Sequence, residues 1–505
     1  MIDGMIKKIV FPILTGFLML WAGVVHAGPE GTLNICQGTA EPLTLDPHMH
    51  HDVETEDIIR QICEHLVDRD ANGRLIPALA TSWNLIDKTT WQFKLRKGVR
   101  FHNGENFDAK AVKFSIERII DPRGRSPQRR LYESIEHVDI INDYTVNIVT
   151  KEIDVLLPGR LSLFANIVPM GYLKEVGESE FAKCPIGTGP FKFLKWEKGR
   201  AVVLTAKDSY LNGPPKIRKV IFKFIADQKE RVKTLLEGEV DILTNIMPHY
   251  RDKLKEDKRI KLLQKANIQF ISVMFNTLGK NVFVDKRVRQ ALNYATDVDK
   301  LIRYVRKGMG RRLATFTMPE EFGYNPDLKP YPFDIDKAKR LLKEAGYPDG
   351  FKIKMLAMES ISALAPALKK QWGKIGVKVE LSYISRADAI SKALIKKEIP
   401  FDIFIGDPIA PLLDASLQMT LHLDPKHPIS KFHNDKISEL LYKSYETIDA
   451  KKRSALLQKI QEIVYEEAPL VFLYQNITLY GVRADVVGFV PYADAMLRLY
   501  NVSKN

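Results

Sequence analysis

The feature that most constrains the fold of this 505-residue chain is a mixture of strand and helix patterns that do not alternate strictly. Apolar runs typical of strands occur at 32–36, 91–95, 269–276, 470–475 and 477–480. Helical spacing occurs at 55–66, 386–396 and 109–120, where Asp108 is placed to cap the helix and Pro122 to end it. This mixture predicts an α/β protein with two lobes and an inserted α+β domain.

Turn residues between two pairs of alternating runs predict two β-hairpins. The first joins 138–141 to 145–150 around Asn142 and Asp143, and the second joins 191–196 to 201–206. The composition is globular, with 45% hydrophobic and 27% charged residues, and the length is sufficient for two or three lobes.

The N-terminus has the features of a secretory signal peptide. Lys7 and Lys8 precede an apolar run at 9–25, and Val25-His26-Ala27 forms a small-x-small cleavage site. An uncleaved membrane anchor is the alternative, but the run is short and contains Pro12 and two glycines. We expect cleavage of residues 1–27, and therefore a periplasmic protein.

The formal net charge is +14, which is compatible with a nucleic-acid or anionic partner. Lysine and arginine alternate with acidic residues at 300–312 and 436–459, as on solvated helical faces. We therefore expect no nucleic-acid partner, while an anionic small ligand stays open. Cys36, Cys63 and Cys184 are an odd number, and buried small apolar residues are the favoured interpretation.

A series of short motifs runs in order along the chain. They are Leu45-Asp46-Pro47, CEHLV at 63–67, PALATSW at 77–83, WQFKLRKGVRFHNG at 91–104, PIGTGPF at 185–191, LEGEVD at 236–241, FN at 275–276 with VDKRVRQAL at 284–292, and AKRLLKEAG at 338–346. Together they resemble the signatures of the large extracytoplasmic solute-binding proteins for oligopeptides, dipeptides and nickel chelates, over residues 32–500. Each motif is weak alone, but their order and spacing are specific.

The resemblance implies a periplasmic-binding-protein-like (type II, Venus-flytrap) fold with a third domain. The expected boundaries are lobe I at 28–64, 187–276 and 477–505, an inserted lobe II at 65–186, and lobe III at 277–476. It also implies that a small ligand is enclosed between lobes I and III, and that the closed form is presented to the membrane permease of an ABC importer. We expect a monomer without a cofactor.

The loop after Leu45-Asp46-Pro47 edges the cleft in the family that the chain resembles. Here it carries Met49, His50 and His51, which we expect to contact ligand. Together with His48 these residues also form the basis for the alternative of metal or nickel-chelate binding, because neutral imidazole is a good metal ligand. Adjacent side chains on a loop seldom converge, so we predict no metal site.

Three further candidate ligand-binding residues are charged. Arg129 and Arg130 lie in a stretch that approaches the ligand's carboxylates in nickel-binding relatives, and guanidinium suits planar carboxylate or phosphate. Solvated loop arginines are the alternative. In FDIFIGDPIAPLLD at 401–414, Asp407 replaces the tryptophan of peptide binders, and their amino-binding aspartate is absent. Asp407 is then expected to hold ligand hydroxyls or an amine.

The sequence contains no catalytic motif such as G-x-S-x-G, H-E-x-x-H or a Walker loop. We therefore predict a binding protein and not an enzyme. The expected ligand is peptide-like, or a modified or anionic organic solute, and the sequence does not decide between them.

Overall fold

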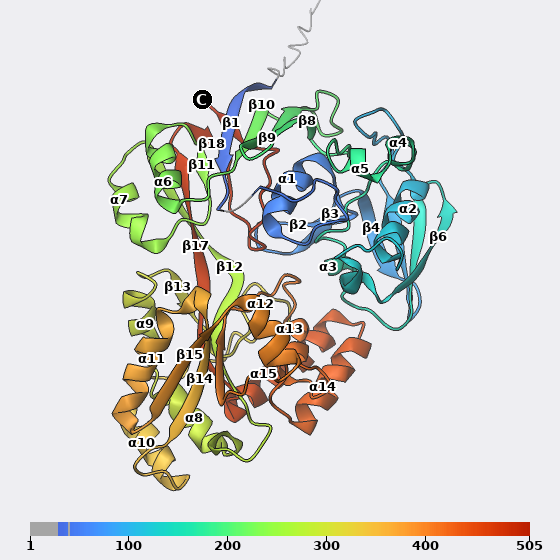
Figure 1. Cartoon of the computed structure of the whole chain (residues 1–505). Coiled ribbons are helices and arrows are strands. Elements are labelled where there is room, and N and C mark those ends of the chain that lie inside the picture. Colours follow the sequence, from blue (N-terminus) through green and yellow to red (C-terminus); the bar gives the residue numbers. More distant parts are fainter. Residues whose placement is uncertain (1–28, 39–40) are drawn as a thin grey trace, which may run out of the picture.

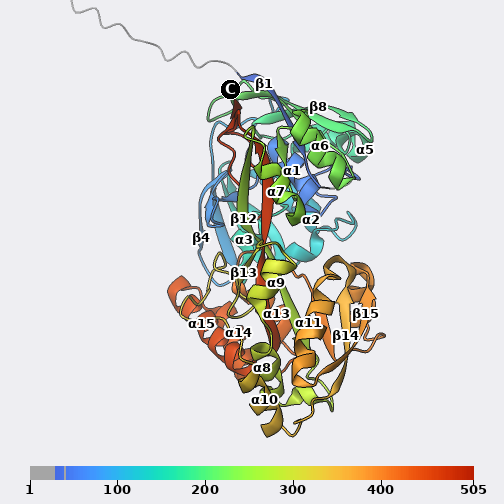
Figure 2. The same ribbon diagram turned by 90° about the vertical axis from the view of Figure 1, so that its left-hand side faces the viewer.

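The computed structural model describes residues 29–38 and 41–505, so the expected signal peptide at 1–27 lies outside the described residues. Figures 1 and 2 show an upper lobe and a lower lobe joined by two long antiparallel strands, β12 (Ile260–Phe275) and β17 (Leu470–Arg483). A side lobe flanks the upper lobe (Figure 1). The lobe boundaries given above stay a prediction.

One 11-stranded sheet runs through both main lobes, in the order β15-β14-β16-β12-β17-β11-β1-β10-β9-β8, with β13 on β17. The upper lobe is built on its strands β1 (Glu30–Cys36), β8 (Phe191–Glu197), β9 (Ala201–Ala206), β10 (Ile217–Lys223) and β11 (Ile242–Leu243). The helices of the upper lobe are α1 (Val53–Ile62), α6 (Gln228–Glu237) and α7 (Arg251–Lys255). Because β12 and β17 belong to both halves of the sheet, they form the only strand connection between the main lobes among the described residues.

The lower lobe is the other half of this sheet, covered by helices. Its strands are β13 (Gly310–Arg312), β14 (Lys352–Met358), β15 (Lys378–Ile384) and β16 (Ile403–Gly406). Its helices are α8 (Lys286–Tyr294), α9 (Val298–Tyr304), α10 (Ile335–Glu344), α11 (Leu364–Trp372), α12 (Arg386–Asp388), α13 (Ala415–Leu423), α14 (Asp435–Glu446) and α15 (Ala450–Glu467). Apolar side chains pack against both faces of its strands, with Trp372 fully buried among them.

The side lobe is a separate α+β unit. A four-stranded antiparallel sheet, β4 (Ala80–Leu85), β5 (Thr90–Leu95), β7 (Thr145–Thr150) and β6 (Ile135–Asn142), packs on α2 (Ala109–Ile120) around its own apolar core. The remaining elements are the hairpin β2 (Val67–Arg69) and β3 (Leu75–Pro77), the 3-10 turn η1 (Arg129–Tyr132), and helices α3 (Leu157–Arg160), α4 (Met170–Val176) and α5 (Glu178–Phe181). Short strands β18 (Val486–Val487) and β19 (Ser503–Lys504) pair near the C-terminus.

Several predicted elements are confirmed. Asp108 caps α2 by accepting hydrogen bonds from Lys110 N and Ala111 N, and both hairpins form, as β6–β7 and β8–β9. Two predictions were wrong. The two closing strands are one 14-residue strand, β17, and the helix expected at 386–396 is the short α12 followed by a π-helix, η6 (Ala389–Ile395). None of the helices in the described ranges has the length and apolar character that crossing a membrane requires.

All three cysteines are free thiols, with Cys36 and Cys63 buried and Cys184 half-buried. Burial raises the pKa of Cys36 to about 11, which keeps this thiol protonated at neutral pH.

The PIGTGPF loop packs directly on the end of α1, which explains its two glycines. A Cβ on Gly187 would lie 2.2 Å from the carbonyl oxygen of Ile62, and one on Gly189 would lie 2.6 Å from that of Gln61. The loop therefore has a structural role.

We predict that Gly187→Ala lowers the free energy of unfolding by about 1–3 kcal/mol, because backbone atoms must move to admit the methyl group. The control is Gly373→Ala, where a Cβ meets nothing within 4 Å, and urea unfolding of both variants makes the comparison. Equal unfolding midpoints for the two variants would show that the loop admits the methyl group without loss of stability.

Candidate ligand-binding site

A cavity of about 170 Å³ lies where the two main lobes meet at β12 and β17. We call it the hinge cavity. The side chains that line it come from the upper lobe, from the crossing strands and from the loops that follow β16 and β18: Gln37, Val53, Glu54, Asp57, Thr244, Asn245, Asn267, Ile268, Gln269, Ile409, Tyr480 and Ala495. Most of these side chains are polar, which suits a hydrogen-bonding ligand.

An irregularity in β12 places three of these residues in the cavity. The register of β12 against β17 shifts between Ala266 and Phe270, so Asn267, Ile268 and Gln269 leave the regular ladder. The loop after β16 pairs with them instead, because Ala410 N donates to Ile268 O (2.7 Å) and Phe270 N donates to Pro408 O (3.1 Å). Bulges of this kind redirect side chains, and here they supply amides to the junction of the lobes.

The upper wall of the hinge cavity is acidic. Glu54 and Asp57 lie three residues apart on α1 and share one helical face. Asp57 accepts hydrogen bonds from Gln37 Nε2 and Leu497 N, both at 2.6 Å. Burial raises the pKa of Asp57 well above its ordinary value and also raises the pKa of Glu54. This wall therefore offers the carboxyl oxygens of two acidic side chains to a donor group.

Asp407, which is 5% exposed, lies beside the hinge cavity and is joined to it through Gln269. It forms an ion pair with Arg386 and accepts hydrogen bonds from Ser360 Oγ and from Gln269 Nε2, each at 3.2 Å. The side chain of Arg386 is 49% exposed. Asp407 therefore orients Arg386, and Arg386 is a half-exposed cation next to the hinge cavity.

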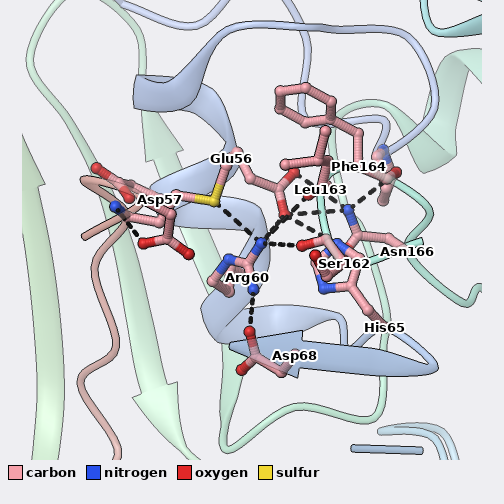
Figure 3. Close-up of polar contacts among 12 residues, drawn as sticks. Glu56, Asp57, Arg60, His65, Asp68, Ser162, Leu163, Phe164 and Asn166 are labelled. Carbon is pink, nitrogen blue, oxygen red and sulfur yellow. Dashed lines mark hydrogen bonds and ion pairs between the residues drawn. The ribbon is translucent and has the colours of Figure 1, made fainter. Parts of the chain in front are cut away.

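The opposite face of α1 is fixed by a buried polar network, shown in Figure 3. Glu56 lies 3.3 Å from His50 Nε2, 3.2 Å from His65 Nε2 and 3.7 Å from Arg60. Asn166 Nδ2 donates to the same carboxylate at 3.1 Å. The network ties α1 to the side lobe, and so holds the upper wall of the hinge cavity in place.

Arg60 extends this network away from Glu56 (Figure 3). Its Nη1 pairs with Asp68 at 2.8 Å, and its Nη2 donates to the carbonyl oxygens of Ser162 (3.1 Å) and Leu163 (3.2 Å). Asp68 in turn pairs with Arg498 at 2.6 Å, which adds the C-terminal segment to the network.

The histidines predicted near the cleft do not converge. His50 is buried against Glu56 and Phe164, and His48 is buried with Nε2 2.8 Å from Asn166 O and Nδ1 2.9 Å from Arg118. Met49 and His51 are exposed on the same loop. Within 29–38 and 41–505, no three His, Cys, Asp or Glu side chains are placed to hold a metal ion. Ligand contact by Met49, His50 and His51 stays a prediction.

Arg129 and Arg130 are exposed on η1 of the side lobe, and neither lines the hinge cavity. Arg129 Nε donates to Ile120 O at 3.1 Å. Their expected role in binding ligand is likewise untested.

Several residues that line or border the hinge cavity could not be recognised from sequence patterns. Asn267 and Gln269 are polar interruptions of an apolar strand, and this interruption is the signal that would have found them. Glu54 and Asp57 resemble other helix-surface acids, and nothing in the sequence distinguishes Arg386 from the other basic residues around it.

Comparison with known proteins shows relatives along nearly the whole chain. It is 29% identical to "Heme-binding protein A" of Haemophilus influenzae, with 88% of this chain and 87% of that protein covered. It is 26% identical to "Glutathione-binding protein GsiB" of Escherichia coli K12, with 88% and 89% covered.

Two solved structures, each 27% identical, have the same fold. HbpA2 from Haemophilus parasuis gives a TM-score of 0.86 and covers 94% of this chain and 100% of its own. The ABC transporter-associated periplasmic binding protein DppA from Helicobacter pylori, in complex with the peptide STSA, gives 0.74 and covers 94% and 98%. The expected mixed α/β binding-protein fold is confirmed.

Residues 74–427 match the family described as bacterial extracellular solute-binding proteins, family 5, middle part. Members of this family are extracellular or periplasmic, bind solutes for ABC importers, and have no catalytic function. The match covers more than half of the chain, and the motifs, the fold and the relatives agree with it. The protein therefore belongs to family 5 of the bacterial extracellular solute-binding proteins.

Proposed function

We propose that the protein captures a small peptide-like solute, one that carries both an amino group and a carboxylate, and delivers it to its importer. The observation that carries this proposal is the pairing of acidic side chains in the hinge cavity with an arginine beside it. Glu54 and Asp57 with neighbouring amides line the hinge cavity. The half-exposed Arg386 lies beside the cavity, joined through Asp407 to Gln269 of the cavity wall. A zwitterionic solute presents an ammonium group to carboxyl oxygens and a carboxylate to guanidinium.

The relatives support this ligand class. One is named for glutathione, a peptide with free carboxylates, and DppA was solved with a bound peptide. A modified or anionic solute that keeps a carboxylate would use Arg386 in the same way. No contact among the described residues favours the metal-chelate alternative, because His48 and His50 already have partners inside the protein.

We propose further that the described arrangement of lobes is the open one. At equal sequence identity, the TM-score is lower with the peptide-bound DppA (0.74) than with HbpA2 (0.86), which indicates that the lobes are placed differently from those of the peptide complex. Closure around β12 and β17 would bring Arg386 toward the acidic wall. Export with removal of residues 1–27 and a monomeric state remain part of this proposal.

We predict that Arg386→Gln weakens binding of peptide-like solutes about 10- to 100-fold, because a charge-assisted hydrogen bond to the carboxylate is lost. The measurement is calorimetric titration of the mature protein with reduced glutathione and with di- and trialanine, after mass spectrometry of any co-purified solute. The better-binding probe serves for all variants.

The matched control is Arg129→Gln, an exposed arginine on η1 of the side lobe, for which we expect a change of less than about threefold. A larger loss of affinity in Arg129→Gln than in Arg386→Gln would place the binding site for the solute's carboxylate at η1. If none of the probes binds and no peptide-like solute co-purifies, the proposed ligand class is wrong.

A further inference from the structure

A second cavity, of about 130 Å³, lies in the lower lobe beside the hinge cavity. We call it the apolar pocket. Its walls are mainly the side chains of Met274, Met358, Ile390, Leu394, Phe404 and Ile429. It belongs to the lobe that carries Arg386, and α12 and α13, which contribute to it, lie at the edge of the lower lobe that faces the upper one (Figure 1).

The apolar pocket adjoins the hinge cavity. Asp407 and Arg386 line the apolar pocket, and Gln269, which lines the hinge cavity, donates through Nε2 to Asp407 at 3.2 Å. Pro408 lines the apolar pocket and the next residue, Ile409, lines the hinge cavity. A solute held by Arg386 therefore lies next to the entrance of the apolar pocket.

A neutral histidine also lines the pocket. Both ring nitrogens of His422 are buried and have no hydrogen-bond partner among the described residues. The ring packs against Phe270 and Phe316, with centroids 6.1 Å and 5.7 Å away. Burial lowers its pKa to about 4, so it is neutral at pH 7 and adds no charge to the pocket wall.

The volume of the pocket limits which side chain of a ligand it can hold. An apolar cavity of about 150 Å³ in another protein stays dry and binds benzene. A cavity of about 130 Å³ therefore accommodates a side chain the size of leucine, methionine or phenylalanine. The two methionines let the walls adapt to the shape of such a group. A charged side chain would lose its hydration here, and the charged pair that lines the pocket, Asp407 and Arg386, is already joined in an ion pair.

We propose that the apolar pocket is the specificity subsite of this protein, receiving one uncharged, apolar side chain of the solute whose carboxylate is held by Arg386. The inference rests on the function proposed above and adds to it a preference among peptide-like solutes. It predicts that one position of a tripeptide has its side chain in this pocket. With leucine at that position, the peptide should bind about 10- to 100-fold more tightly than with glycine there.

The test blocks the entrance of the apolar pocket with a larger side chain. Ile390, on η6, is 39% exposed, so Ile390→Trp places an indole over the entrance with little risk to folding. Ile395→Trp is the matched control, because Ile395 is 45% exposed on the same π-helix and does not line the pocket. The probes are trialanine peptides with glycine, leucine, phenylalanine or aspartate at each position in turn, titrated by calorimetry.

We expect Ile390→Trp to abolish the preference for leucine over glycine and Ile395→Trp to keep it. A second variant, Met358→Ala, enlarges the pocket and should shift the preference toward phenylalanine. If peptides bind but leucine gives no advantage, or if Ile390→Trp keeps the advantage, the subsite is wrong while the proposed function stands.

If no peptide binds at all, the proposed function is wrong. A second probe then tests whether the apolar pocket binds an apolar group. The melting temperature is then measured in benzene-saturated buffer. A rise in the wild type that Ile390→Trp removes supports an apolar guest from another class of solute. No rise in the wild type overturns the inference altogether.

Discussion

Replacing Glu56 by glutamine is expected to lower the free energy of unfolding by about 3–5 kcal/mol, the usual cost of breaking a buried ionic network from one side. Glu56 is fully buried, and its carboxylate is the common partner of His50, His65, Arg60 and Asn166. Glutamine keeps the shape of the side chain but loses its negative charge. The buried guanidinium of Arg60 then has one negatively charged neighbour fewer. Urea unfolding at pH 7 measures the difference.

The pH dependence gives the same prediction a second readout. Burial alone would raise the pKa of Glu56, but the contacts with His50 and His65 outweigh burial and lower it to about 2. A carboxyl with a lowered pKa stabilises the fold at neutral pH, and this contribution is lost as the pH falls from about 4.5 to about 2. The Glu56→Gln variant should lack this part of the acid sensitivity.

The control is Glu439→Gln on α14, where the carboxylate is exposed and pairs with Lys436 on the surface. We expect no change in its unfolding midpoint. Equal midpoints for the two variants would mean that the network in Figure 3 contributes nothing to stability.

Replacing Glu321 by glutamine is expected to stabilise the protein, and more so as the pH rises. Glu321 is 4% exposed; its Oε2 accepts a hydrogen bond from Met318 N at 2.6 Å, and its Oε1 has no partner among the described residues. Burial, with nearby Asp414 and Glu320, raises its pKa to about 8. The folded state therefore holds a proton that the unfolded chain releases near pH 4.5.

The sign follows from proton linkage. Between about pH 4.5 and 8 the folded state binds the extra proton, so this group lowers stability as the pH rises. At about 1.4 kcal/mol for each pH unit, the wild type should lose about 3 kcal/mol between pH 5.5 and 8.5 through this group. Glu321→Gln should not lose it, and its advantage should grow by that amount over the interval.

Urea unfolding at both pH values measures this advantage, with Glu462→Gln on the exposed face of α15 as the control. If the stability of Glu321→Gln runs parallel to that of the wild type across the interval, Glu321 is already ionised at pH 5.5 in the folded protein. The raised pKa would then be wrong.

Local sequence patterns predicted the elements that depend on near neighbours. Asp108 and Pro122 bound α2, and Asn142 with Asp143 forms the turn of the β6–β7 hairpin, because caps and turns depend on residues a few positions apart. The single strand β17 was missed because polar Asn476 interrupts its apolar pattern. Its side chain donates through Nδ2 to Gln269 Oε1, and this partner is 207 positions away.

The candidate site was less predictable for the same reason. The histidine loop looked like a ligand site because His48, His50 and His51 are adjacent in sequence. Two of the three are used by Arg118 and Glu56, and that use depends on contacts with α1, α2 and the side lobe. The hinge cavity combines residues from positions 37 to 495, and only the path of the crossing strands brings them together.

The position of β17 in the sheet has a consequence for how the chain reaches its folded state. This strand, near the end of the sequence, pairs with β12 on one side and with β11 and β13 on the other. Neither main lobe can therefore complete its half of the sheet until residue 483 has been synthesised. Pairing between residues so far apart in sequence makes folding slow. Until β17 is available, we expect most of the chain to be incompletely folded, with unpaired strand edges that a chaperone must protect.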